Sequence, residues 1–224
     1  NLAIDKREIA TIVLGDQVVP ATGILPPGFP GFSESVSGYT FDPERAQQLL
    51  RESKYGNDLE NLPPLTITTP GSFGANVSLD MEVILAMWEK NLGIKTEFQQ
   101  TEFATFLKDL NKRRFQMFDI GWIADYPDPE NFLDILFYSD SSNNHTNYNN
   151  PEVDSLLEQA RGETDEARRF SIYNQVEQTI LDDAPWIPLW YSGERYLLVK
   201  SNVHDYLQTP LIIPKLRHVY LTDE

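Results

Sequence analysis

The chain has 224 residues, of which 41% are apolar and 23% charged, as is typical of a globular protein with one large domain or two small ones. Its net charge of −16 disfavours nucleic acid or an anionic membrane surface as a partner. It has no cysteine, which excludes disulfides and thiolate metal sites, and no run of about 18 apolar residues that could span a bilayer. Because the chain starts at Asn1 within what reads as continuous sequence, we expect a processed chain or an excised part of a longer one.

The first fifty residues predict two helices joined by a long irregular segment. Asp5 is a suitable N-cap with Glu8 three residues later, so we expect a helix that ends at Gly15. Residues 20–40 are rich in proline, glycine and serine and show no apolar period, which indicates an extended linker or a crossing between lobes. Asp42, followed by proline, then caps a second helix.

The middle of the chain alternates strands and helices. We expect strands at Leu65–Thr68, Ile94–Phe98 and from Phe115 to near Asp125, with a helix before the second strand (Met81 to Leu92, ended by Gly93) and one before the third (Phe103 to Leu110). This βαβαβ order predicts a largely parallel sheet, in which ligands bind beyond the carboxyl ends of the strands. Asp125 is expected at such an end.

The segment 115–132, FQMFDIGWIADYPDPENF, holds the residues most suited to contact a ligand. An apolar run breaks there into a loop, which the two prolines at 127 and 129 make rigid. A carboxylate between large aromatic side chains can pair with an ammonium group and cover its apolar neighbour. The alternative is a surface turn whose Trp and Tyr only close the core. The candidate side chains are those of Trp122, Asp125, Tyr126, Asp128 and Glu130.

Two helices and several short strands are predicted after this loop. Asn150, followed by proline, caps the first helix, and Thr164 opens the second, which runs to about Asp182 before Ala184-Pro185 ends it. Strands are expected at residues 186–191, 196–199 and 218–221.

Several motifs, in this order and spacing, resemble the large solute-binding proteins of bacterial ABC importers, family 5, of the peptide, dipeptide and nickel type. The motifs are Ala3-Ile4-Asp5-Lys6-Arg7, Pro20-Ala21-Thr22-Gly23, Leu25-Pro26-Pro27-Gly28, Phe41-Asp42-Pro43-Glu44-Arg45-Ala46, Gly121-Trp122, Ala124-Asp125-Tyr126-Pro127-Asp128-Pro129, Asn150-Pro151-Glu152-Val153-Asp154, Ala184-Pro185 and Ile187-Pro188-Leu189.

This resemblance implies an α/β fold of the periplasmic-binding-protein type (type II, cluster C), with a mixed sheet flanked by helices. It implies that the chain is the C-terminal part of a protein whose N-terminal lobe is missing here. Residues 1–24 would lie near the first lobe, 25–199 would form the second ligand-binding lobe, and 200–224 would return toward the first. The whole protein would lie in the periplasm or on the cell surface as a lipoprotein, bind peptides without a cofactor and deliver them to an ABC permease.

The resemblance also implies binding residues. In peptide-binding members the acid of the Gly-Trp-x-x-Asp segment holds the N-terminal ammonium of the peptide, and that acid corresponds to Asp125. Gly121, Trp122 and Tyr126 would belong to the same pocket wall.

Two further points concern the ligand. Either Trp190 or Tyr191 is expected to contact it, depending on which face of their strand points inward. Some peptide-binding members have an arginine just before the Gly-Trp pair, where this chain has Asp119. A longer peptide, or a ligand with only a positive end, therefore suits the site better than a short zwitterionic dipeptide.

Other functions have weaker support. Asp125, Asp128 and Glu130 could be paired acids of a glycosidase, but proline on both sides of Asp128 favours a solvated turn. The sequence has no nucleophile elbow, P-loop or dinucleotide fingerprint, so we expect no enzyme. No two histidines lie within a helical turn, so we expect no metal site; they are His145, His204 and His218. A nickel chelate or an oligosaccharide remains the alternative solute.

Overall fold

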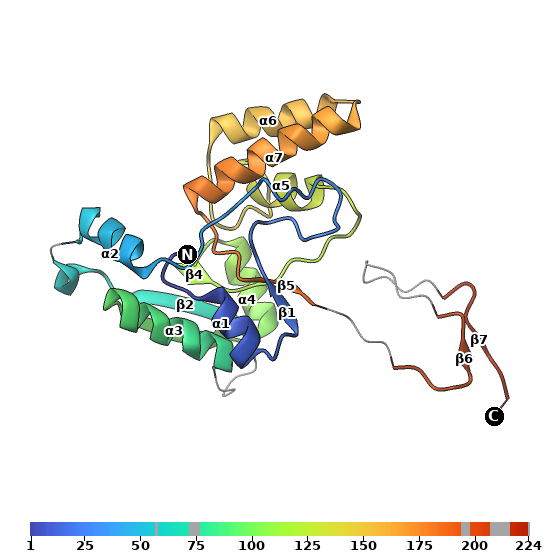
Figure 1. The fold of residues 1–224 in the computed structure, drawn as a ribbon, viewed down its shortest axis with the longest axis horizontal. Coiled ribbons are helices and arrows are strands. Elements are labelled where there is room, and N and C mark those ends of the chain that lie inside the picture. Colours follow the sequence, from blue (N-terminus) through green and yellow to red (C-terminus); the bar gives the residue numbers. More distant parts are fainter. Residues whose placement is uncertain (57, 72–76, 194–197, 207–215, 224) are drawn as a thin grey trace.

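The computed structural model describes residues 1–56, 58–71, 77–193, 198–206 and 216–223 (Figure 1). Its helices are α1 (Lys6–Glu8), η1 (Ile9–Val13, a π-helix), α2 (Pro43–Glu52), η2 (Leu59–Asn61, a 3-10 helix), α3 (Leu79–Leu92), α4 (Phe103–Asn111), α5 (Glu130–Phe137), α6 (Pro151–Gly162) and α7 (Glu166–Asp183). Its strands are β1 (Val18–Pro20), β2 (Leu65–Pro70), β3 (Thr96–Thr101), β4 (Met117–Phe118), β5 (Trp190–Ser192), β6 (Val203–His204) and β7 (Tyr220–Leu221).

The predicted βαβαβ order is confirmed as a parallel sheet in the order β3-β2-β4. β2 pairs with β3 over its whole length, from Leu65↔Thr96 to Pro70↔Thr101. β4 pairs with β2 only at Ile67↔Met117 and Thr68↔Phe118. The expectation of a strand that continues to near Asp125 is therefore wrong, because the pairing ends at Phe118 and the Asp119 amide makes the last hydrogen bond to β2.

Most of the predicted helix ends are confirmed by capping contacts. The side chains of Asp5, Asp42 and Asn150 each accept hydrogen bonds from backbone amides of the helix that follows. Gly93 ends α3 in the left-handed conformation. The last long helix is capped by Asp165, one residue after the expected Thr164.

Two apolar clusters hold the chain together. The smaller one joins the N-terminal turns to α3 and includes Ile4, Ile9, Ile84 and Trp88, with Trp190 packed against it. The larger one lies among α5, α6 and α7, which form the upper part of Figure 1. It also takes in Leu25 from the irregular segment that follows β1. The domain division at residues 24/25 and 199/200 stays a prediction.

Three polar side chains fix the backbone of residues 21–25, the start of the predicted extended linker. Lys6 Nζ donates to the carbonyl oxygen of Ala21 at 2.7 Å, and the Tyr191 hydroxyl both donates to Gly23 O (2.8 Å) and accepts from Gly23 N (2.9 Å). Glu177 Oε1 accepts from the amides of Ile24 and Leu25 at 2.6 and 2.9 Å. A Cβ at position 23 would lie 2.6 Å from that Glu177 oxygen, so a larger residue there would displace the carboxylate that holds this backbone.

Other expectations need correction. α5 was not expected, although its apolar residues recur at helical spacing after Pro129. β5 begins at Trp190 rather than at residue 186, and β3 begins at Thr96 rather than Ile94. The strand expected at 196–199 lies partly outside the described residues, and Leu198 and Val199 are not in a strand.

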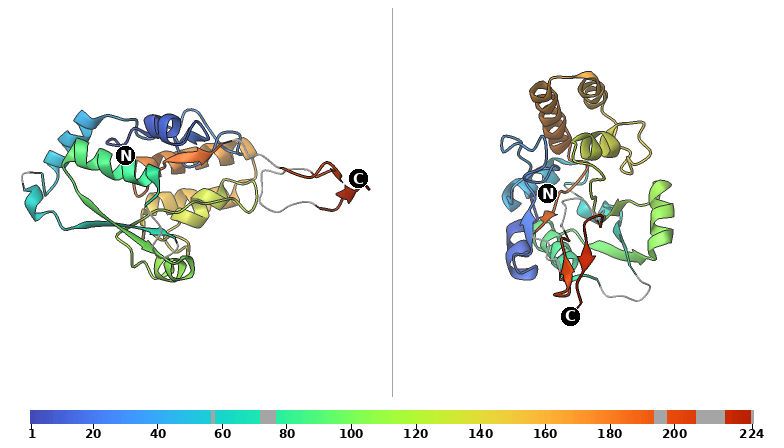
Figure 2. Two further views of the ribbon diagram at one scale, coloured as in Figure 1. Left: turned by 90° about the horizontal axis from the view of Figure 1, so that it is seen from below. Right: turned by 90° about the vertical axis from the view of Figure 1, so that its right-hand side faces the viewer.

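The end of the described chain forms a two-stranded antiparallel ladder, β6 with β7. It lies apart from the other elements in Figure 1 and in the left view of Figure 2. The strand expected at 218–221 is confirmed only at its last two residues. Within the described ranges, the helices are all too short or too polar to cross a membrane.

Candidate functional site

The loop between β4 and α5 contains the first group of predicted ligand-binding residues. Its last contact with the sheet is the hydrogen bond from the Asp119 amide to Thr68 O, at 3.2 Å. From there the loop runs without regular structure to Pro129. A Cβ added at Gly121 would meet open space, so the backbone there is accessible to a ligand. Ala124 is buried, whereas Asp125 is exposed. The loop therefore attaches to the core at one position and presents the next residue to the outside.

The carboxylate of Asp125 is available for a ligand. Within the described part of the chain, it accepts no hydrogen bond and forms no salt bridge, although the Asp125 backbone amide donates to Asn131 Oδ1 at 3.3 Å. An exposed carboxylate on a loop whose backbone is held can bind a cation without giving up another partner. The structure thus leaves Asp125 free to act as predicted, while its role stays a prediction.

The aromatic residues beside Asp125 have different environments. The indole Nε1 of the half-buried Trp122 donates to Asn131 O at 3.0 Å and to Asn131 Oδ1 at 3.1 Å. The Tyr126 hydroxyl donates to Glu130 Oε2 at 2.8 Å, and the side chain is 39% exposed. The pKa of Tyr126 is raised above its usual value, mainly by burial and secondly by this hydrogen bond. Tyr126 is therefore held toward α5 and still presents part of its ring to solvent.

Asp128 has a structural role. It forms a bidentate ion pair with Arg169 of α7, with both nitrogen–oxygen distances at 2.7 Å, and accepts from the amide of Glu130 at 3.0 Å. Burial works to raise the pKa of Asp128, but the hydrogen bonds from Arg169 and Glu130 outweigh it and hold that pKa below its usual range. Because Asp128 is paired with Arg169 and Glu130 with Tyr126, the structure gives no support to the glycosidase alternative.

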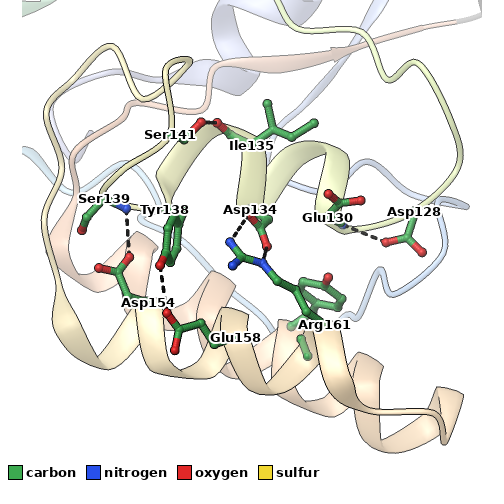
Figure 3. A network of polar contacts seen from close by, with 12 residues as sticks. Asp128, Glu130, Asp134, Ile135, Tyr138, Ser139, Ser141, Asp154, Glu158 and Arg161 are labelled. Atoms are coloured by element: carbon green, nitrogen blue, oxygen red, sulfur yellow. Dashed lines mark hydrogen bonds and ion pairs between the residues drawn. The ribbon is translucent and has the colours of Figure 1, made fainter.

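Further polar contacts join α5 to α6 and fix the base of the loop (Figure 3). Arg161 makes two hydrogen bonds to Asp134, at 2.7 and 2.8 Å, and the Tyr138 hydroxyl donates to Glu158 at 2.8 Å. Figure 3 shows Glu130 at the start of the helix that carries Asp134, and Asp128 on the loop just before it. α5 is thereby a rigid support for the loop that precedes it.

The second group of predicted residues lies on β5. Trp190 packs against the smaller apolar cluster, and the Tyr191 hydroxyl is engaged twice by the backbone of Gly23. Burial raises the pKa of Tyr191, which therefore stays protonated at neutral pH. Both side chains thus have structural contacts, and which of them reaches a ligand stays a prediction.

A small pocket lies beside the loop. It is lined by Phe118, Ile120, Gly121, Trp122, Leu136, Asn143, His145 and Trp186, and its volume of about 30 Å³ would hold about one water molecule. The pKa of His145 is lowered, mainly by burial and secondly by the positive charge of Arg113, so this imidazole is neutral at pH 7. Among the residues that the structure describes, no three His, Cys, Asp or Glu side chains gather as a metal site.

Two residues near the loop differ from the sequence-based expectation: Asn131 was not predicted to matter, and Asp119 was expected inside a strand. Asn131, which lies beneath Trp122 and Asp125, was not predicted, since an asparagine near a helix start has no distinctive pattern. Asp119 lies directly after β4 and is half-buried. Burial, followed by the charge of Asp80, raises the pKa of Asp119 above its usual value.

The sequence matches a family model described as bacterial extracellular solute-binding proteins, family 5 Middle, over residues 1–144. The chain belongs to this family. The expected resemblance is thereby confirmed, and the family is one of solute-binding proteins rather than enzymes.

Relatives of known description support the same assignment. The chain is 32% identical to Heme-binding protein A of Haemophilus influenzae over 216 residues, 94% of this chain and 38% of that protein. It is 31% identical to the periplasmic oligopeptide-binding protein OppA of Escherichia coli, over 99% of this chain and 41% of that one. The chain thus spans about two fifths of the length of these relatives.

Solved structures confirm the predicted fold class. OppA of Burkholderia pseudomallei superposes with a TM-score of 0.81 at 27% identity, over 99% of this chain and 44% of that chain. The dipeptide-binding protein of Pseudoalteromonas sp. SM9913, in complex with Met-Leu, gives a TM-score of 0.80 at 26% identity, over 98% of this chain and 43% of that chain. The periplasmic binding protein DppA of Helicobacter pylori, in complex with the peptide STSA, gives a TM-score of 0.83 at 24% identity, over 99% of this chain and 42% of that chain.

Proposed function

We propose that the protein containing this chain captures peptides outside the cytoplasm and delivers them to an ABC permease. Its ligand would be held between two lobes, of which this chain supplies the one that carries Asp125. The observation that carries the proposal is the exposed Asp125 carboxylate, free of described partners, on a loop that is anchored on both sides. Membership of the solute-binding family and similarity to OppA of E. coli support the peptide as ligand class.

The chemistry follows from closure of the lobes. An ammonium group that closure removes from water needs a charged partner, because leaving one member of a buried charge pair alone costs about 3–5 kcal/mol. Asp125 would supply that partner, and Trp122 and Tyr126 would cover the apolar neighbour of the ammonium. The open space at Gly121 would let the ligand approach the backbone. The ligand then favours the closed state only by its differential affinity for the two states.

The proposal is tested with Asp125→Asn in the full-length protein. Its dissociation constants are measured for a peptide with a free N-terminus and for the N-acetylated form. We expect a loss of about 100-fold or more for the free peptide, corresponding to about 3 kcal/mol, and little loss for the acetylated one. Asp140→Asn, which removes the same charge from another exposed position, should change neither value. Equal losses for both ligands in Asp125→Asn would exclude the ammonium assignment.

The ligand itself is identified by native mass spectrometry of the full-length protein purified from its own cells. Co-purifying peptides of mixed sequence and narrow length would support main-chain recognition anchored at Asp125. A sugar, a metal chelate or one metabolite would leave the transport role intact and overturn the peptide assignment.

A non-peptide solute is the second candidate, because the relative with 32% identity is named Heme-binding protein A. Titration of the full-length protein with hemin, followed by the haem absorption band, tests this directly. Saturable binding of hemin that competes with peptides would favour the second candidate; absence of binding would exclude haem as the solute.

A further inference from the structure

On the basis of the proposed function, we infer that Asn131 is a positioning residue that sets the preference for free N-terminal amines. It does so by fixing the backbone of Asp125 relative to the indole of Trp122 from beneath the loop. Asn131 is the second residue of α5 and is 0% exposed, so it would act through the loop rather than touch the ligand itself.

The hydrogen bonds of the loop single out this residue. Of the backbone amides at positions 120–127, only that of Asp125 donates to another described residue, and its acceptor is Asn131 Oδ1. The same oxygen accepts from Trp122 Nε1, which also reaches the Asn131 carbonyl. One buried residue therefore supplies the acceptors for two loop positions that have no strand partner.

Packing alone does not explain an amide at this position. Phe132, Leu133 and Leu136, which neighbour Asn131 in α5, belong to the larger apolar cluster, and the one buried charge of this helix, Asp134, is paired with Arg161. Asn131 Nδ2 lies near the Tyr126 hydroxyl but forms no well-aligned hydrogen bond, and a poorly paired buried donor carries a cost in stability. The two acceptor bonds to the loop offset that cost, which an apolar side chain would not incur.

The consequence for binding is preorganisation. Without Oδ1, the Asp125 amide and the Trp122 indole lose a common acceptor, and the loop must pay ordering entropy when the ligand arrives. The loss of affinity should appear for ligands whose ammonium group pairs with the Asp125 carboxylate and not for ligands that lack an ammonium group. Asn131 would thus govern the ratio between the two affinities.

The test uses Asn131→Leu in the full-length protein, with tri-alanine and N-acetyl-tri-alanine as probes in calorimetric titrations. We expect the affinity for tri-alanine to fall about tenfold relative to that for the acetylated probe. The matched control is Asn144→Leu. Asn144 is also fully buried and binds the backbone of Tyr138 and Tyr148 in another loop. This control should lower stability and leave the affinity ratio unchanged.

Two more variants keep the test decisive. Asn131→Asp keeps an oxygen acceptor and should retain the preference for tri-alanine, even if the buried charge lowers stability. Should Asn131→Leu fail to fold, Asn131→Ala removes the same acceptor without adding apolar bulk. The Trp122 indole Nε1–H resonance should shift in the Leu and Ala variants and stay near its original position in Asn131→Asp.

The outcomes separate the two proposals. An unchanged affinity ratio in the variants that lack the acceptor overturns the role of Asn131, while a lost preference in Asp125→Asn still supports the proposed function. If the unaltered protein does not distinguish the two probes, both the ammonium pairing and the positioning role fail.

Discussion

Two irregular segments of this chain, residues 21–25 and residues 119–129, use polar groups in opposite ways. The first receives side chains from three separate elements: Lys6 of α1, Glu177 of α7 and Tyr191 of β5. The second leaves Asp125 exposed and is held from beneath by α5.

The difference separates structure from binding. In the first segment, buried backbone groups find partners in incoming side chains, as buried polar groups must. In the second, the exposed Asp125 carboxylate has no partner among the described residues and can meet a ligand. If this distinction is correct, substitutions in the first segment should affect stability, and substitutions in the exposed part of the second should affect binding alone.

The largest expected difference is in the free energy of unfolding, between variants at an apolar residue of each segment. Leu25 is fully buried in the larger cluster, whereas Ile123 is 45% exposed in the loop. Leu25→Ala should lower the free energy of unfolding by about 2–5 kcal/mol because it leaves a cavity. Ile123→Ala should change it by no more than about 0.5 kcal/mol. Urea unfolding of both variants measures this, and similar losses would contradict the distinction.

The next comparison uses two acids three residues apart. Asp128→Asn breaks the bidentate pair with Arg169 and should cost about 2 kcal/mol of stability, since a hydrogen bond to a charged group contributes about 1.5–3 kcal/mol. Asp125→Asn should leave stability within about 0.5 kcal/mol. Thermal unfolding at neutral pH checks both. A large destabilisation in Asp125→Asn would show that this acid has a structural partner.

A smaller effect is expected at β5. Tyr191→Phe removes the hydroxyl that donates to and accepts from Gly23, and should cost about 1–2 kcal/mol. Peptide affinity of the full-length protein should stay unchanged if Tyr191 serves only the fold. A loss of affinity without a loss of stability would instead place Tyr191 at the ligand.

The smallest effect depends on pH. Burial raises the pKa of Glu177 above its usual 4.5, against the lowering effect of the Leu25 and Ile24 amides. A group with a raised folded-state pKa contributes stability below its unfolded pKa and loses it as the pH rises. Glu177→Gln keeps an oxygen acceptor but cannot ionise. Its stability relative to the original protein should therefore increase as the pH rises above about 4.5, the usual glutamate value.

Denaturant unfolding of both proteins between pH 4 and pH 8 measures this difference. Parallel stability profiles would show that the Glu177 carboxyl has a similar pKa in the folded and unfolded states.

Much of the local structure could be predicted because it depends on neighbouring residues. Asp5, Asp42 and Asn150 cap the helices that follow them, and Gly93 ends α3, because capping is a contact within a few positions. The position of the candidate loop was also evident from its acids, aromatics and prolines. What failed was the length of β4, because strand ends depend on the partner strand and β2 pairs with it at only two positions.

Sequence alone was enough for the caps at Asp5, Asp42 and Asn150, for the alternation of strands and helices in the middle of the chain and for the family. Tertiary structure decided which polar residues serve the fold and which remain available. Asp128 pairs with Arg169, which is 41 residues away, and Tyr191 binds Gly23 across 168 residues, distances that no local pattern encodes. The role of Asn131 belongs to the same class, because its oxygen becomes an acceptor for the loop only when α5 packs beneath it.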